Sequence, residues 1–386
     1  MYTEKLYYKD SHCFEFTALV LDCRDTPKGP AVILDRTAFF PEGGGQQADT
    51  GSLGAVKVLD VHEKEGEILH YCDGPLMPGE RVEGRLDAEQ RLVRMQNHSG
   101  EHVVSGLAHK LFGCENVGFH MGEDFVTIDF DRELSREQLM EIETLANRAV
   151  REDLPVSCTF PEPEVLKSLE YRSKLELTEN VRIVEIPGVD RCACCAPHVE
   201  RTGEIGLIKV LDWERHRGGL RLSLACGMLA LRDYRVKQEN ISAISQALSS
   251  KRHETAAAVE RLLQEQQKSK ERIAALSLEL ARYMAEDREE TEGNICVFDS
   301  VLDEVALREL VNLLMEKCRG IAAAFSGDDR RGYRYIMGSR ELDMRSLAKE
   351  LNSLIEGRGG GKARMIQGST SASAAAIAAV FERDFR

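Results

Sequence analysis

The chain has 386 residues and a formal net charge of −14 at pH 7, which argues against indiscriminate binding of nucleic acid. This length exceeds that of one ordinary domain, so we expect about two to four. The polar start Met1–Lys5 and the lack of any apolar run of membrane-spanning length predict neither a signal peptide nor membrane association. An odd count of 11 cysteines then favours a reducing, cytoplasmic location, with thiols that are free or bind metal.

Residues 1–86 contain short apolar runs bounded by turn-forming residues. Phe16–Val20, Gly29–Leu34 and Arg81–Leu86 are examples. Many short strands at this spacing predict a small β-barrel or sandwich.

A glycine-rich segment interrupts these strands at Gly43, Gly44, Gly45 and Gln46. Consecutive glycines tolerate positive φ and allow backbone amides to approach a ligand closely. Composition alone equally suits a plain hairpin loop. No Gly-Lys-Ser/Thr follows, so the segment is not a Walker loop.

A helix is predicted from Asp87, a good N-cap, to about Phe112, before Gly113. His98 and His102 lie one turn apart on one face of this helix, so both imidazoles could bind one ion. Such a pair alone is more often a surface or core feature. The zincin signature is excluded because Ser99 follows the first histidine, and the deaminase signature because no P-C-x-x-C occurs.

A second half-site follows the predicted strand Val181–Ile186. Cys194 and His198 are four residues apart, and Pro197 favours a turn there over a helix. Three imidazoles and one thiolate suit tetrahedral Zn²⁺. We therefore predict a zinc site made of His98, His102, Cys194 and His198.

The composition changes after Gly227. From Met228 to Thr291 neither Gly nor Pro occurs, and apolar residues keep helical spacing. A polar break at 249–253 predicts two antiparallel helices, which would act as a spacer or a dimerisation hairpin.

From Asn294 strands and helices alternate, which predicts a small α/β domain. Residues 330–364 carry nine Arg and Lys against four acidic residues, and a Gly-rich loop is expected between the last two helices. Such a charge excess is often only a solvated face. Together with loop amides that could meet phosphate, it predicts RNA-backbone binding. The residues expected to bind are Arg358, Gly359, Gly360, Gly361, Lys362 and Arg364.

Five motifs occur in a distinctive order: F-F-P-E-G-G-G-Q at 39–46, H-S-G-E-H at 98–102, C-C-A-P-H-V at 194–199, T-G-E-I-G at 202–206 and R-G-G-L-R at 217–221. This order resembles the editing part of alanyl-tRNA synthetase, and the helical hairpin and G-G-G segment resemble its C-terminal domain. Because the predicted barrel begins almost at residue 1, we expect no aminoacylation domain. The expected family is therefore the long form of the free-standing alanyl-tRNA editing proteins.

The resemblance implies a hydrolase that acts in trans, does not use ATP and maintains the accuracy of translation. Its substrate would be tRNA(Ala) mischarged with serine, or with glycine. The four predicted zinc residues match the family's ligands, and Gly43–Gln46 would lie beside the aminoacylated 3′ end. The C-terminal domain would form a homodimer or hold the tRNA.

The chain also departs from the family pattern. Cys195-Ala196-Pro197 replaces the common Gly-Gly-Thr, so Cys192 and Cys195 are alternatives to Cys194 as ligand. Asn116 stands where the synthetase has a pocket glutamine, and we predict that Asn116 and Thr127 bind the serine hydroxyl. Glu101 is expected to point away from the ligand face, which leaves no general base assigned. Zinc would either activate water or only anchor the substrate.

The expected fold class is α+β. The predicted parts are a β-barrel subdomain (1–86), a zinc-binding editing domain (87–227), a helical hairpin linker (228–291) and a C-terminal α/β domain (292–386). Two alternative functions stay open at this point: a zinc hydrolase of small esters or amides, and a catalytically silent zinc-containing tRNA-binding protein. A phosphoesterase is disfavoured because no Asp-His-His motif is present.

Overall fold

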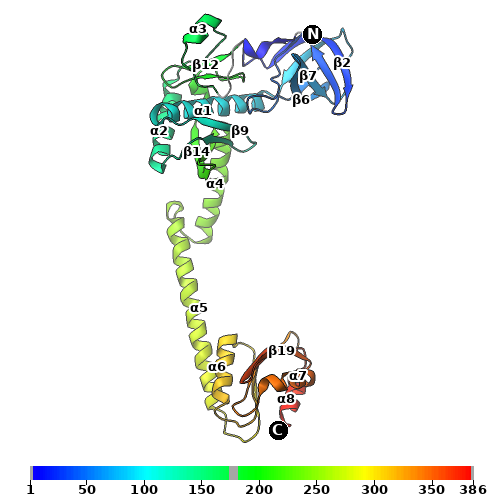
Figure 1. Cartoon of the computed structure of the whole chain (residues 1–386), viewed down its shortest axis with the longest axis vertical. Helices are drawn as coiled ribbons and strands as arrows, with labels where there is room; N and C mark the ends of the chain where they lie inside the picture. Colours follow the sequence, from blue (N-terminus) through cyan, green and yellow to red (C-terminus); the bar gives the residue numbers. More distant parts are fainter. Residues whose placement is uncertain (1–2, 174–180, 384–386) are drawn as a thin grey trace. The chain divides into compact units, whose positions relative to one another are not determined.

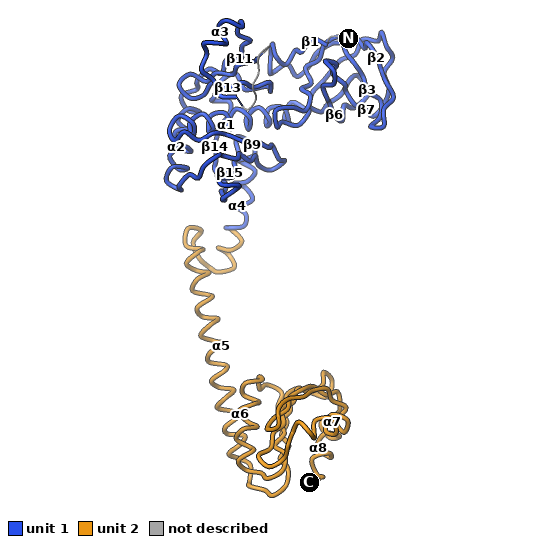
Figure 2. Tube along the Cα trace, viewed as in Figure 1, with its two compact units in different colours: residues 1–241 blue, residues 242–386 orange. Residues whose placement is uncertain are grey.

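The computed structural model describes residues 3–173 and 181–383. It confirms the α+β class (Figure 1) and divides into two compact units, Met1–Ile241 and Ser242–Arg386 (Figure 2). The finer boundaries within these units stay a prediction. None of the described helices combines the length and the apolarity that a membrane span requires.

The first unit begins with strands that close into a barrel. Their order around it is β2 (Glu15–Thr26), β3 (Gly29–Leu34), β7 (Glu67–Cys72), β6 (Val56–Lys64), β5 (Gly51–Leu53) and β8 (Arg81–Leu86). The short strands β1 (Glu4–Lys5) and β4 (Arg36–Thr37) pair in parallel beside it, and η1 (Leu6–Tyr8) follows β1. Alternate residues of the barrel strands point inward, where Val20, Val32 and Val61 are buried.

Helix α1 (Ala88–Phe112) is the central element of this unit. The Asp87 side chain accepts a hydrogen bond from the Gln90 amide, and the helix ends at Gly113 in the left-handed conformation, as predicted. The helix packs against α2 (Arg136–Glu152), β9 (Asn116–Met121), β13 (Asp190–Ala193) and β15 (Gly219–Cys226). It is therefore buried along most of its length, polar residues included.

Two small sheets flank α1. One has the order β14 (Ile208–His216), β15, β10 (Val126–Phe130), β9, and the other has the order β11 (Ser157–Thr159), β12 (Ile183–Ile186), β13. A capping box between Ser135 and Gln138 starts α2. The remaining short elements are α3 (Pro163–Ser168) and η2 (Thr202–Ile205).

A buried ion pair ties α1 to the barrel segment that carries the glycines. Arg91 is fully buried, and its Nε donates to Asp49 Oδ2 at 2.9 Å. The same guanidinium donates to the Ala38 carbonyl, while Asp49 also accepts from the Phe40 amide at 2.7 Å. These contacts fix residues 38–49 against the N-terminal half of α1.

Helix α4 (Met228–Ala247) begins in the first unit, and the second contains η3 (Arg252–Glu254), α5 (Thr255–Glu286) and a five-stranded sheet. The strand order is β16 (Ile295–Asp299), β17 (Ala322–Asp328), β18 (Gly332–Gly338), β20 (Met365–Thr370) and β19 (Gly357–Lys362). Helix α6 (Glu304–Leu314) covers one face of the sheet, and α7 (Met344–Leu354) and α8 (Ala374–Phe381) cover the other.

The predicted Gly-rich loop is wrong, because residues 357–362 form the edge strand β19. A Cβ on Gly359 would lie 2.3 Å from both the Gln367 carbonyl and the Tyr335 hydroxyl. Glycine therefore permits close approach of the strands here, a use that composition alone does not distinguish from a loop.

Replacing Asp49 by Ala should destabilise the first unit by about 3–5 kcal/mol, because it leaves the Arg91 charge buried without its partner. Denaturant unfolding followed by circular dichroism would measure the loss. Glu15→Ala, at an exposed position on β2, is the control and should change stability by less than about 0.5 kcal/mol. Equal stabilities for the two variants would contradict this role of Asp49.

Candidate metal centre

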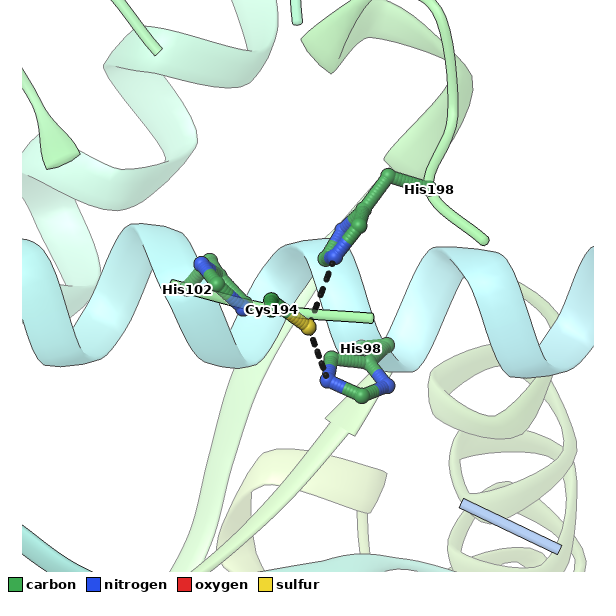
Figure 3. Close-up of side chains that lie close together, drawn as sticks. All are labelled: His98, His102, Cys194 and His198. Carbon is green, nitrogen blue, oxygen red and sulfur yellow. Dashed lines mark hydrogen bonds between the residues drawn. The ribbon is translucent and has the colours of Figure 1, made fainter. Parts of the chain in front are cut away.

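The structure brings the four predicted ligands together. His98 and His102 project from α1, and Cys194 and His198 come from the segment after β13 (Figure 3). One ligand atom from each lies within 4.8 Å of all the others. The Cys194 Sγ atom is 3.5 Å from His98 Nε2 and 3.4 Å from His198 Nε2. This arrangement of three nitrogens and one sulfur suits Zn²⁺.

Each imidazole is oriented by a different partner on its Nδ1 atom. The Nδ1 of His98 is 2.9 Å from Gln46 Oε1, and that of His102 is 2.9 Å from Asp190 Oδ2. The Nδ1 of His198 is 3.0 Å from Ser99 Oγ. All three partner oxygens can accept a hydrogen bond from Nδ1–H, so each Nε2 lone pair is left for a metal.

The electrostatics favour the metal-binding forms of two ligands. Burial lowers the pKa of His198 to about 3, so its imidazole is neutral. Burial alone would raise the pKa of the Cys194 thiol, but His98 and the hydrogen bond with His102 hold it well below its usual range. A neutral imidazole and a thiolate are the forms that bind zinc.

Asp190 links the His102 imidazole to a partly buried arginine. Arg172 donates to both carboxylate oxygens, from Nε at 2.8 Å and from Nη2 at 2.9 Å. Although burial opposes it, His102 and Arg172 lower the pKa of Asp190 to about 2. The ionised carboxylate in turn raises the pKa of His102 against the effect of burial, so a metal ion would displace a proton there.

Two glycines allow α1 to approach its neighbours closely. A Cβ at Gly106 would lie 2.5 Å from Asp190 Cβ and 2.6 Å from the Val189 carbonyl oxygen. A Cβ at Gly100 would lie 2.3 Å from Cys226 Sγ. Gly106 therefore sets the distance at which Asp190 meets His102.

A cavity of about 530 Å³ opens beside the four ligands. Its lining includes His98, His102 and Cys194. The aromatic rings of Tyr8, Phe119 and Phe160, among others, add apolar surface, while Glu101, Asn116, Arg172 and Arg182 add polar groups. A mostly apolar cavity with a few convergent polar groups is typical of a small-molecule or cofactor site.

Part of the predicted glycine segment reaches this cavity. Gly44 and Gly45 belong to its lining, whereas Gly43 and Gln46 close a tight turn through mutual backbone hydrogen bonds. The buried Gln46 side chain orients His98 and is not part of the lining, and its predicted substrate contact stays a prediction.

The predicted hydroxyl-binding residues lie elsewhere or are engaged. Thr127 sits on β10 opposite His120 and Ser223, outside the cavity lining. Asn116 lines the cavity, but its Nδ2 donates to Glu101 and its Oδ1 accepts from the Gly118 amide. Thr127 therefore lies away from the cavity, whereas binding of a serine hydroxyl by Asn116, whose Oδ1 can accept a second hydrogen bond, stays a prediction.

The expectation for Glu101 is wrong. Its carboxylate lines the cavity, with Oε2 3.9 Å from His102 Nε2. The missed signal is its spacing of three residues from His98, which also places two residues on one helical face.

The neighbouring cysteines differ in their surroundings. Cys192 groups with His102 and Asp190, whereas the four-residue cluster with all three histidines contains Cys194. Cys195 is exposed and lines the cavity.

The predicted RNA-binding residues lie in the second unit. Arg358 and Lys362 are exposed on β19, and Arg364 is in the turn to β20. Arg358 also borders a groove of about 1070 Å³ that Arg331 and Arg334 line as well. The structure thus places several cations on this side of the sheet.

Three family models match the chain: tRNA synthetases class II (A) at 11–90, the threonyl and alanyl tRNA synthetase second additional domain at 181–222, and the DHHA1 domain at 292–383. An alanine–tRNA ligase of Halorubrum lacusprofundi is 34% identical over 347 residues, 85% of this chain and 37% of that protein. That of Methanopyrus kandleri is 32% identical over 388 residues, 95% of this chain and 42% of that protein.

This chain belongs to the alanyl-tRNA synthetase-like family. It spans about two fifths of the length of the relatives it matches. Among solved structures, the C-Ala domain of Aquifex aeolicus alanyl-tRNA synthetase matches with 20% identity and a TM-score of 0.22, covering 25% of this chain and 96% of that domain.

Replacing Gly106 by Ala should lower zinc affinity by about 10–100-fold, because the added methyl group displaces Asp190 from His102. Competition with a fluorescent zinc chelator would measure the change. Gly43→Ala is the matched control, since its Cβ would meet its nearest neighbour, the Pro41 carbonyl, at 3.8 Å. Unchanged affinity in the Gly106 variant would show that this close approach does not control the site.

Proposed function

We propose that this protein hydrolyses the ester of mischarged Ser-tRNA(Ala), and of Gly-tRNA(Ala), as a free-standing editing enzyme. The observation that carries the proposal is the cluster of His98, His102, Cys194 and His198, of which the first three line an open cavity. The family relationship supports a tRNA substrate, and the cavity has room for an aminoacyl group and its ribose.

The four clustered side chains would hold Zn²⁺ through three Nε2 atoms and one thiolate. Bound zinc would polarise the ester carbonyl or lower the pKa of a water molecule. Gln46, Asp190 and Ser99 would keep the imidazoles in the orientation that this requires. Gly44 and Gly45 would border the 3′ end of the tRNA at the cavity wall.

Such an activity has a physical reason. A pocket shaped for alanine cannot strongly reject an analogue that is smaller or that adds one hydroxyl group. A second site that hydrolyses the wrong ester therefore restores the accuracy of charging. The cations around Arg358 would bind the tRNA backbone, and the C-terminal unit would also be the part that forms a homodimer.

A catalytically silent tRNA-binding protein with a structural zinc is the second candidate. The observation in its favour is the number of protein ligands, because four-coordinate zinc sites are usually structural and catalytic ones keep a position open. It predicts that Ser-tRNA(Ala) stays intact in the presence of the protein.

Incubation of the purified, zinc-loaded protein with Ser-tRNA(Ala) and Ala-tRNA(Ala) tests the proposal. Serine should be released at least about ten times faster than alanine, as followed by release of the radiolabelled amino acid. Cys194→Ala should lose both zinc and deacylation, whereas Cys195→Ala should keep both. Persistence of the serine ester with wild-type protein would favour the silent tRNA-binding protein.

Replacing Arg358 and Lys362 together by Ala should weaken tRNA binding, because two phosphate contacts are lost. The slope of the logarithm of the binding constant against the logarithm of the salt concentration should become shallower by about 1–2. Filter binding at several salt concentrations would measure both. Arg148→Ala with Arg151→Ala, on the exposed side of α2, is the charge-matched control. An equal loss in the control would mean that net charge alone matters.

A further inference from the structure

Glu101 occupies an unusual position for a carboxylate. The residue is 4% exposed, it precedes the metal-site residue His102 on α1, and it lines the cavity. Its Oε1 atom accepts hydrogen bonds from Ser105 Oγ at 2.6 Å and from Asn116 Nδ2. Asn116 is itself held through its Oδ1 by the Gly118 amide at 3.1 Å. The carboxylate is therefore fixed in orientation by two neighbours.

This orientation directs the second carboxylate oxygen toward the four clustered ligand side chains. Both of these hydrogen bonds end on Oε1, and Oε2 lies 3.9 Å from the Nε2 atom of His102, the nitrogen that faces the other ligands. Glu101 does not belong to the group of four ligand atoms that meet within 4.8 Å. The Oε2 atom would thus lie next to a bound metal ion and face the molecule that the ion binds.

A positively charged ligand would need this carboxylate to bind in the cavity. Among the described residues that line the cavity, Glu101 is the single acid, beside Arg172 and Arg182. Asp190 already neutralises Arg172, and Arg182 donates to the Cys194 and Ala196 carbonyls. A zinc ion with one thiolate keeps a net positive charge, so a cationic ligand would meet repulsion there without Glu101.

We propose that Glu101 binds the α-ammonium group of the aminoacyl ester through Oε2, an inference that rests on the proposed function. The α-nitrogen is two bonds from the ester carbonyl carbon, so a carbonyl group at the metal brings the ammonium group within a few ångströms of Glu101. The substrate class is then esters of amino acids with a free amino group. Ser105 and Asn116 are positioning residues for this contact.

Binding of non-hydrolysable probes tests the inference. The probes are 3′-deoxy-3′-(L-serylamino)adenosine and its N-acetyl derivative, titrated calorimetrically into the zinc-loaded full chain. Wild type should bind the free amine at least about ten-fold tighter, the effect of a desolvated charged contact. In Glu101→Gln this ratio should fall to about one, while affinity for the N-acetyl probe stays within about two-fold.

Controls separate a charge contact from a structural effect. Glu115→Gln, at an exposed position beyond the end of α1, should keep the wild-type ratio. Zinc content measured by mass spectrometry should be unchanged in both variants. An equal loss of affinity for both probes in Glu101→Gln, or an unchanged ratio, would overturn the inference. Wild-type protein that does not discriminate the probes would also overturn it, whether or not the variant folds.

The outcome is separable from that of the proposed function. Intact Ser-tRNA(Ala) together with a Glu101-dependent preference for the free amine would refute hydrolysis and support the ammonium site. Hydrolysis of Ser-tRNA(Ala) with no such preference would support the enzyme and refute the role of Glu101.

Discussion

The hydrogen bonds on the far nitrogens of three histidines are the contacts on which the candidate site depends. An imidazole can bind a metal through either nitrogen, and a partner on Nδ1 decides which one is used. Here Gln46, Asp190 and Ser99 each hold one ring, so that three Nε2 atoms converge near the Cys194 sulfur. Through these contacts, residues of the barrel segment, of α1 and of β13 meet at the candidate metal site.

Bringing these polar groups into the interior is costly, and the fold compensates each charge locally. The Arg172–Asp190 pair is nearly buried and adjoins His102, and the Arg91–Asp49 pair fixes the barrel segment that carries Gln46. Unpaired, any of these charges would destabilise the fold by several kcal/mol. The same networks that keep α1 buried therefore also set the geometry of the site.

Local chemistry made part of this structure predictable. The ends of α1 and the capping box of α2 follow from residues within one turn, as does the pairing of His98 with His102 on one face. The partners of the imidazoles were not predictable in this way. Gln46 lies 52 residues from His98, and Asp190 lies 88 residues from His102, so only the tertiary fold shows the contacts. The structural role of the glycines was also not predictable from local sequence. Those of β19 allow close packing of strands, although their sequence is typical of a loop.

X-ray absorption at the zinc edge of the purified protein tests the central claim most directly. The account predicts a first shell of three nitrogen atoms at about 2.0–2.1 Å and one sulfur atom at about 2.3 Å. A shell with two or more sulfur atoms, or with oxygen and nitrogen alone, would contradict the assignment of His98, His102, Cys194 and His198 as the metal centre.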